Sequence, residues 1–492
     1  MFSIIKKTIK NSAVYGAGTL SSKLIGFVLL PLYTSYLSTS EYGILAVVEI
    51  TSTLLMAVLS LKINAGFFRW YWDKNFIDRQ KSIFFSSFVL LIFVCLLFLI
   101  PTILLDKHIS ELLFSTKKYS HLIVLMILST ALQVIIQLVL YLIQLQGKAK
   151  FYSIVSIIKL LIALIFTIIF ITYFGRGING IYEALIISQI LFLLITARFV
   201  VRNITVKFES VILIDMLKFS LPLIFAEISG ILLTVSDRYM LNFMSTSSEV
   251  GIYSLGFKIS NTIRVFIYSS VMMAVSPIIY QYIDKPNNKR FYSKIMTYFA
   301  FGSMTFVLFF SIFSSELVEL LAQNKEYWKS SEVIPILSFS IFFGILKDSS
   351  LTGLNITKKS QIIAIIVLFT SIMNILLNYL LIPILQTSGA AIATLISSVT
   401  AYFVSYNYAQ KNYRIPYEIK KITLIIFVGI SLFVISNLFT SVTFFVLLTI
   451  KSLLFVSYPF ILYKLNFFEE VEISSLKRGF NDFKLLIRQK IL

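Results

Sequence analysis

The sequence predicts an all-α integral membrane protein of about fourteen transmembrane helices, and its composition and its apolar periodicity both lead to this fold class. Of its 492 residues, 58% are hydrophobic and 13% are charged, whereas soluble domains average roughly 45–50% apolar and about 25% charged residues. The apolar residues fall in repeated blocks about 20 residues long, which is the length of a helix that crosses a bilayer. A membrane β-barrel would instead show alternating segments of about 10 residues.

Fourteen apolar runs bounded by polar or charged turns are the predicted spans. They cover residues 12–33, 41–62, 82–105, 121–145, 151–174, 180–200, 216–236, 250–280, 292–313, 331–352, 361–382, 388–409, 422–439 and 442–463. The uncharged stretch from Ser360 to Gln410 is too long for one span, and Pro383 to Gly389 supply a turn in its middle. We therefore expect two helices there.

The basic residues predict the orientation of the chain. With the N-terminus inside, the cytoplasmic segments hold 31 Lys and Arg residues and the opposite side holds 7, and basic residues accumulate in cytoplasmic loops. Both termini are therefore predicted to be cytoplasmic. Because the basic residues are scattered among short loops, the net charge of +20 is a topology signal and does not indicate a nucleic-acid partner.

A segment of the first half of the chain recurs in the second half. The sequence from Tyr36 to Ile44 reappears from Phe243 to Ile252 at an offset of 207 to 208 residues, with one residue inserted. Gly180 and Ala184 likewise reappear as Gly389 and Ala393 at an offset of 209. These offsets predict two six-helix lobes in the same orientation, related by a pseudo-two-fold axis along the membrane normal. Two such bundles facing one another form a central cavity, as in transporters.

The predicted units follow from this duplication and end with two additional helices. They are residues 1–11 as a cytoplasmic amphipathic N-terminus, 12–205 as the N-lobe with spans one to six, 206–410 as the C-lobe with spans seven to twelve, 411–463 as spans thirteen and fourteen, and 464–492 as a cytoplasmic tail.

Basic residues inside the spans mark the candidate substrate site, because an ionisable group in the membrane is costly and usually faces a cavity. The five such residues are Lys23, Lys159, Lys258, Arg264 and Lys451. Spans one and eight each have a polar cationic face, so Lys23, Lys258 and Arg264 are predicted to hold an anionic substrate, such as a diphosphate. The alternative is that these cations have a structural role. They would then form buried ion pairs with Glu49 or Glu227, or a lysine side chain would extend to the membrane interface.

Further polar residues lie at helical spacing within the spans. The residues predicted to line the cavity are Asn261, Gln133, Gln137, Asn374 and Asn378. Polar residues at this spacing also form hydrogen bonds that hold neighbouring membrane helices together. Three carboxylates, Glu49, Glu227 and Asp348, are candidates for coupling to protons or sodium. The single Cys and the two His residues leave almost nothing for a metal site, so no cofactor and no catalytic residue is predicted.

A known family resembles this chain over essentially its whole length. The pieces are Lys218-Phe219-Ser220-Leu221-Pro222-Leu223, Ser236-Asp237-Arg238-Tyr239 and Val250-Gly251-Ile252-Tyr253-Ser254. They resemble the Wzx-type O-antigen and capsule flippases of the polysaccharide biosynthesis family, in the MATE-like MOP superfamily. The resemblance implies movement of undecaprenyl-diphosphate-linked oligosaccharides to the outer leaflet of a bacterial cytoplasmic membrane by alternating access. It also implies membrane lipids and a polysaccharide polymerase as partners.

Two other function classes stay open at this point. The same superfamily contains multidrug antiporters, whose cavities should be net acidic so that they bind cationic drugs. The acidic residues Glu49, Glu227 and Asp348 leave the antiporter function open for this chain. A polytopic membrane enzyme of glycan assembly is disfavoured by the short external loops and by the absence of a catalytic constellation. The sequence does not distinguish protons, sodium and the membrane potential as the energy source for transport.

Overall fold

The computed structural model describes residues 27–283, 285–439, 443–470 and 472–474, and regular structure there is helical. The N-lobe contains α2 (Leu30–Tyr36), α3 (Thr39–Leu59), α4 (Ile63–Tyr71), η1 (Lys74–Arg79), α5 (Gln80–Leu104), α6 (Asp106–Phe114), α7 (Ser120–Leu145), α8 (Ala149–Thr172) and α9 (Gly177–Arg202). The C-lobe contains α10 (Ser210–Met244), α11 (Ser247–Ile263), η2 (Arg264–Ser269), α12 (Ser270–Gln281), α13 (Asn288–Ile312), α14 (Ser314–Leu321), η3 (Lys325–Lys329), α15 (Ser330–Ser350), α16 (Thr352–Ile356) and α17 (Ser360–Asn412). Two further helices, α18 (Ile419–Ser436) and α19 (Phe444–Lys464), follow.

The predicted fold class is confirmed. Within the described residues, ten helices are long and apolar enough to cross a membrane, and each predicted span from the second to the fourteenth coincides with helix. Most of the first predicted span, residues 12–33, lies outside the described residues.

The long helix α17 is bent into two, as predicted from its sequence. Gln386 has φ 49° and ψ −124°, which is not helical, and Pro383 lies just before it. A Cβ on Gly389 would lie 2.4 Å from the carbonyl oxygen of Leu381, so the close approach of the backbone at this bend requires glycine. The bend divides the uncharged stretch into two spans.

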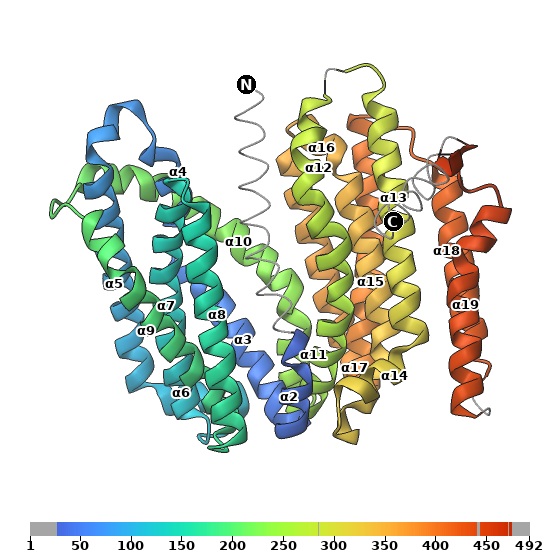
Figure 1. Cartoon of the computed structure of the whole chain (residues 1–492), viewed down its shortest axis with the longest axis horizontal. Coiled ribbons are helices and arrows are strands. Elements are labelled where there is room, and N and C mark those ends of the chain that lie inside the picture. Colours follow the sequence, from blue (N-terminus) through green and yellow to red (C-terminus); the bar gives the residue numbers. More distant parts are fainter. Residues whose placement is uncertain (1–26, 284, 440–442, 471, 475–492) are drawn as a thin grey trace, which may run out of the picture.

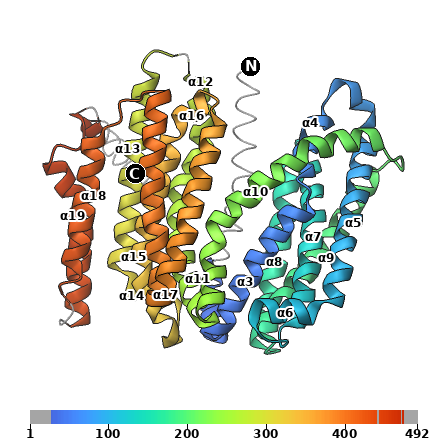
Figure 2. The ribbon, with the colours of Figure 1, turned by 180° about the vertical axis from the view of Figure 1, so that it is seen from behind.

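The two lobes stand side by side and converge at one end (Figures 1 and 2). We call this the narrow end; α2, the beginning of α3 and the beginning of α11 lie there. The ribbons diverge toward the other end, which we call the basic end. It contains the connections from α4 to α5, from α7 to α8, from α9 to α10 and from α16 to α17, and each of these connections includes a lysine in the sequence.

Helix α10 crosses from the N-lobe to the C-lobe (Figures 1 and 2). It has 35 residues and extends beyond the predicted span 216–236 at both ends. Its first half contacts the N-lobe, where the backbone N–H of Gly66 donates to Ser220 Oγ over 3.3 Å and Lys62 Nζ lies 2.7 Å from Glu227 Oε1. Its second half packs on α17, so this one helix contacts both bundles.

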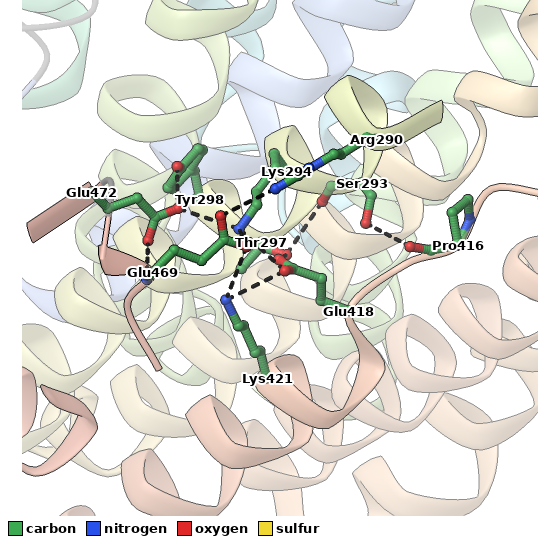
Figure 3. Close-up of polar contacts among 10 residues, drawn as sticks. All are labelled: Arg290, Ser293, Lys294, Thr297, Tyr298, Pro416, Glu418, Lys421, Glu469 and Glu472. Carbon is green, nitrogen blue, oxygen red and sulfur yellow. Dashed lines mark hydrogen bonds and ion pairs between the residues drawn. The ribbon is translucent and has the colours of Figure 1, made fainter. Parts of the chain in front are cut away.

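The last two helices are joined to the C-lobe by ion pairs. At the basic end, Lys294 on α13 lies 3.1 Å from Glu418, 2.6 Å from Glu469 and 3.3 Å from Glu472 (Figure 3). Toward the narrow end, Lys451 Nζ on α19 lies 2.6 Å from Glu316 Oε1 on α14. Both ends of α19 are therefore fastened to the same lobe.

Candidate functional site

A polar cavity lies between the lobes. Its water-accessible volume is about 160 Å³. The residues that line it come from α3 of the N-lobe and from α10 and α11 of the C-lobe: Tyr42, Leu45, Ala46, Glu49, Ile50, Arg238, Ser254, Phe257, Lys258 and Asn261. Its charged groups are two cations, Arg238 and Lys258, and one carboxylate, Glu49. The cavity is therefore cationic on balance.

Lys258 is held against aromatic rings. Its Nζ lies 5.7 Å from the centre of the Tyr33 ring and 5.9 Å from that of Tyr42, distances at which an ammonium is attracted to a ring face. Both tyrosines are buried. Among the residues that the structure describes, no carboxylate oxygen lies within 4.0 Å of Lys258 Nζ, and Glu49 is the carboxylate that lines the same cavity.

Arg238 is the second cation of this cavity. Its guanidinium carbon lies 4.2 Å from the centre of the Phe257 ring, the side chain is 9% exposed, and its buried Nε has no hydrogen-bond partner. An unpaired donor of this kind is costly unless a ligand accepts from it. Arg238 was not among the predicted site residues, although it belongs to the Ser236–Tyr239 segment that carries part of the family resemblance.

A larger cavity within the C-lobe adjoins the first. Its water-accessible volume is about 430 Å³, and Phe257 and Asn261 line both cavities. Arg264, Lys347, Asn374 and several hydroxyl side chains also line it. Together the two cavities present four cations and two carboxylates, Glu49 and Asp237, beside hydroxyl and amide groups.

Arg264 lies in a locally widened turn and is paired. It begins the π-helical segment η2, a feature that is frequent at functional sites. Its guanidinium donates to Asp348, and Lys347 Nζ lies 3.1 Å from the other oxygen of the same carboxylate. Two cations thus share one carboxylate, which leaves a net positive charge at this wall of the larger cavity.

Asp237 is the centre of a buried hydrogen-bond network. It accepts from Tyr253 (2.6 Å), Thr394 (2.7 Å) and Asn378 (2.7 Å), and Asn378 also donates to Asn374 over 3.0 Å. The carboxylate is 3% exposed and its partners are neutral. It was missed in the sequence because its partners come from two other helices, α11 and α17, and two of them lie more than 140 residues away along the chain.

The other predicted residues lie in several places. Lys23 lies outside the described residues. Gln133 Oε1 accepts from Lys159 Nζ over 3.0 Å within the N-lobe. Gln137 donates to Tyr141 over 2.7 Å and lines a cavity of about 150 Å³ between the N-lobe and α10.

The three predicted coupling carboxylates are not brought together. Glu49 lines the central cavity, Glu227 pairs with Lys62 across the lobes, and Asp348 pairs with Arg264. In the described part of the chain, no group of three His, Cys, Asp or Glu residues could hold a metal ion.

The chain matches known families in sequence. Residues 8–283, more than half of the chain, match the family model described as polysaccharide biosynthesis protein, and residues 222–380 match the MatE model. A Haemophilus influenzae protein named Lsg locus putative protein 1 is 24% identical over 285 residues, which cover 56% of this chain. The chain spans 66% of the length of that relative.

Solved structures share the fold. One titled lipid II flippase MurJ, inward closed conformation, superposes with a TM-score of 0.75 at 14% identity and covers 92% of this chain and 99% of its own. An inward-facing multidrug resistance MATE transporter of the MOP superfamily gives a TM-score of 0.63 at 14% identity, covering 84% of this chain and 95% of its own. The chain therefore belongs to the polysaccharide biosynthesis protein family and has the fold of the MOP superfamily.

Proposed function

We propose that this protein moves a lipid-linked oligosaccharide, with an undecaprenyl diphosphate carrier, from the cytoplasmic to the outer leaflet of a bacterial cytoplasmic membrane. The observation that carries the proposal is the cationic cavity between the lobes. Lys258 and Arg238 both line this cavity, and cationic side chains bind phosphate oxygens by charge-assisted hydrogen bonds. The family match supports the same substrate class.

The basic end is proposed to face the cytoplasm, with both chain termini on that side. The 31 to 7 division of basic residues supports this orientation. The diphosphate then enters from the basic end and binds Lys258 and Arg238, with Lys23 as a further candidate. The glycan occupies the adjoining C-lobe cavity, where Asn261 and Asn374 offer hydrogen bonds, while the polyprenyl chain stays in lipid.

Alternating access is the proposed mechanism. Rocking of the lobes closes the basic end and opens the narrow end, which exposes the cavity to the outer leaflet. An inside-negative potential favours outward passage of an anion by about 2.3 kcal/mol per charge per 100 mV if the charge moves uncompensated. Coupling to protons or sodium is proposed at Glu49, Glu227 or Asp348, and the buried Asp237 is a further candidate.

A MATE-like drug antiporter is the second candidate function. The buried carboxylate of Asp237, beside the C-lobe cavity, is the observation that favours it, because a cationic drug needs an acidic partner. The MatE match covers this part of the chain. The sign of the charge that faces the central cavity favours the flippase.

The test is a gene deletion complemented by variants. We expect the deletion strain to accumulate complete lipid-linked repeat units inside and to lose surface glycan. Lys258→Met should fail to complement at wild-type levels of membrane insertion, whereas Lys218→Met, which removes an exposed cation from α10, should complement. If Lys258→Met restores surface glycan fully, the cavity cation has no role in transport. If the deletion leaves the glycan intact and sensitises cells to cationic drugs, the antiporter function replaces this proposal.

A further inference from the structure

A turn at the basic end has the same local structure in both lobes. Between α7 and α8, Gly147 has φ 68° and Lys148 follows it directly before α8; between α16 and α17, Lys358 has φ 57° and Lys359 follows it directly before α17. The two following lysines have nearly the same backbone angles, φ −85° and ψ 57° for Lys148 and φ −90° and ψ 55° for Lys359. A residue in the left-handed region commonly ends a helix. Lys148 and Lys359 therefore occupy equivalent places, one in each lobe.

The helix end beside each turn is duplicated as well. The end of α9 has the residues Phe199, Arg202 and Asn203, and at an offset of 209 residues the end of α17 has Tyr408, Lys411 and Asn412. The side-chain amide of each asparagine donates to the carbonyl oxygen of the aromatic residue, over 2.8 Å in the N-lobe and 2.7 Å in the C-lobe. Each helix end therefore carries an aromatic ring, a cation and an asparagine in the same order.

In the N-lobe, side chains join the turn to the helix end. Lys148 Nζ lies 4.6 Å from the centre of the Phe199 ring, within the range of a cation–π contact. Gln146, just before the turn, donates to Asn203 Oδ1 over 2.7 Å. We call the residues 146–150 and 198–203 together the N-lobe corner.

The C-lobe contacts join the same two elements. Lys359 Nζ donates to Asn412 Oδ1 over 2.6 Å, and Lys411 Nζ lies 5.8 Å from the centre of the Tyr408 ring. We call the residues 358–361 and 407–414 together the C-lobe corner. Both corners lie at the basic end, in different lobes (Figure 1).

The two corners carry positive charge without carboxylates to balance it. Within the described ranges, no ion pair involves any of their exposed cations, which are Lys148, Lys150, Arg198, Arg202, Lys358, Lys359, Lys411 and Arg414. The sequence itself has no Asp or Glu between Glu111 and Glu183, between Glu183 and Glu209, or between Asp348 and Glu418. An anionic group can therefore approach either corner without meeting a negative charge from these segments.

Exposed apolar stripes begin at the corners and run away from the basic end. On α8, Lys150 shares one helix face with the exposed residues Ile154, Ile157 and Leu161. On the first half of α17, the exposed residues Ile365, Leu368 and Ile372 repeat this spacing. Each stripe lies in a helix long and apolar enough to span the membrane. Cations at the head of such stripes match a phospholipid, which joins an anionic headgroup to acyl chains.

We propose that each corner binds the phosphate of an anionic phospholipid in the leaflet at the basic end, so that one chain has two equivalent lipid sites. Lys148 with Arg202, and Lys359 with Lys411, donate charge-assisted hydrogen bonds to the phosphate oxygens. The aromatic ring of each corner lies at the headgroup level, where such rings concentrate. The acyl chains follow the exposed stripes. Basic pockets between membrane helices bind anionic headgroups in this way, and the inference does not depend on which substrate the protein transports.

Native mass spectrometry of the full chain in detergent tests the proposal, with phosphatidylglycerol and phosphatidylcholine added in turn. We expect two phosphatidylglycerol molecules to bind each chain more tightly than phosphatidylcholine. Lys148→Gln with Arg202→Gln should remove one of them, and Lys359→Gln with Lys411→Gln should remove the other. Each cation near a membrane surface strengthens the binding of anionic lipid about fivefold, so each double variant should weaken its own site about 25-fold.

Two controls separate the corners from positive charge in general and from misfolding. Lys207→Gln with Lys218→Gln removes two exposed cations of the same end that lie 3.2 Å from Glu209 and 3.8 Å from Asp215, and it should still bind two phosphatidylglycerol molecules. The charge-preserving exchange of Lys148→Arg with Arg202→Lys should bind as the wild type does.

Three results would overturn the proposal. The first is equal affinity of the wild type for the two lipids. The second is two tightly bound phosphatidylglycerol molecules after all four glutamine substitutions, or loss of the lipid in the charge-preserving variant. The third is displacement of the lipid by inorganic phosphate at equal concentration, because the corners would then be sites for a soluble anion and the apolar stripes would have no part in binding.

Discussion

The ion pair between Lys451 and Glu316 fastens α19 to the C-lobe, and its removal should destabilise the protein measurably. The two side chains are 11% and 17% exposed, and their charged atoms are 2.6 Å apart. Glu316 Oε2 has no hydrogen-bond partner, so Lys451 is what compensates this carboxylate in the described structure. Lys451→Met keeps the length of the side chain and removes the charge.

The expected size follows from the cost of an uncompensated charge. Removing one member of a buried ion pair costs about 3–5 kcal/mol, and the residual exposure of both groups places this pair near the lower value, about 3 kcal/mol. Replacing both residues, as Lys451→Met with Glu316→Leu, removes the isolated charge as well. Because such replacements are often neutral, the double variant should recover most of the loss.

A double-mutant cycle measures this coupling. The free energy of unfolding of the wild type, both single variants and the double variant would be determined by denaturing-detergent titration with tryptophan fluorescence. The coupling energy is the sum of the two single losses minus the loss of the double variant, and with these values it should be at least about 3 kcal/mol. Lys464→Met, at the end of the same helix, is the control for removal of a cation without this partner. Single variants as stable as the wild type, or a double variant whose loss equals the sum of the two single losses, would refute the reasoning.

Three further predictions concern other contacts. Asp237→Asn should destabilise the protein by about 1–3 kcal/mol, because an amide N–H₂ would face a hydrogen-bond donor in the network that now surrounds the carboxylate; thermal unfolding that matches the wild type would contradict this. Gly429→Leu should cost about 1–3 kcal/mol by overpacking α18 on Met304, whereas Gly429→Ala should cost less because the sulfur of Met304 can move; equal losses in thermal unfolding would argue against this packing. For Glu418 at the start of α18, burial raises the pKa, but hydrogen bonds from Thr297 and Lys294 and nearby cationic charge outweigh burial and hold its pKa below the ordinary 4.5. Its stabilising contribution is therefore present above pH 4.5 and is lost as the pH falls through the lower folded-state pKa, so thermal unfolding between pH 6 and pH 3 should show an acid-induced loss that is smaller in Glu418→Gln.

The amino-acid sequence by itself determined the membrane fold class, the positions of the spans and the duplication. These are local properties: apolar runs long enough to cross a bilayer, turn residues such as Pro383, and the helix-start pattern that Ser38 and Thr246 share. Each acts within a segment of about 20 residues or fewer, where hydrophobicity and capping decide the conformation. Lys258 was found in the same way, because a cation in an apolar span is visible without knowledge of its neighbours.

Only the tertiary structure decided which of these residues meet. Arg264 pairs with Asp348 and Lys62 with Glu227, although the helical stripes alone left Glu49 and Glu227 as candidate partners for the intramembrane cations. Arg238 faces the cavity and Asp237 accepts hydrogen bonds from side chains of α11 and α17 because of the rotation and tilt of α10 against those helices. Those variables depend on side-chain packing between helices remote in the chain, which the 100° periodicity of a single helix does not encode. The same holds for Gly43 of α3 and Gly251 of α11. A Cβ on Gly43 would lie 1.7 Å from the carbonyl oxygen of Ser247 and 2.9 Å from the backbone nitrogen of Gly251, and this contact exists because the two lobes converge at the narrow end.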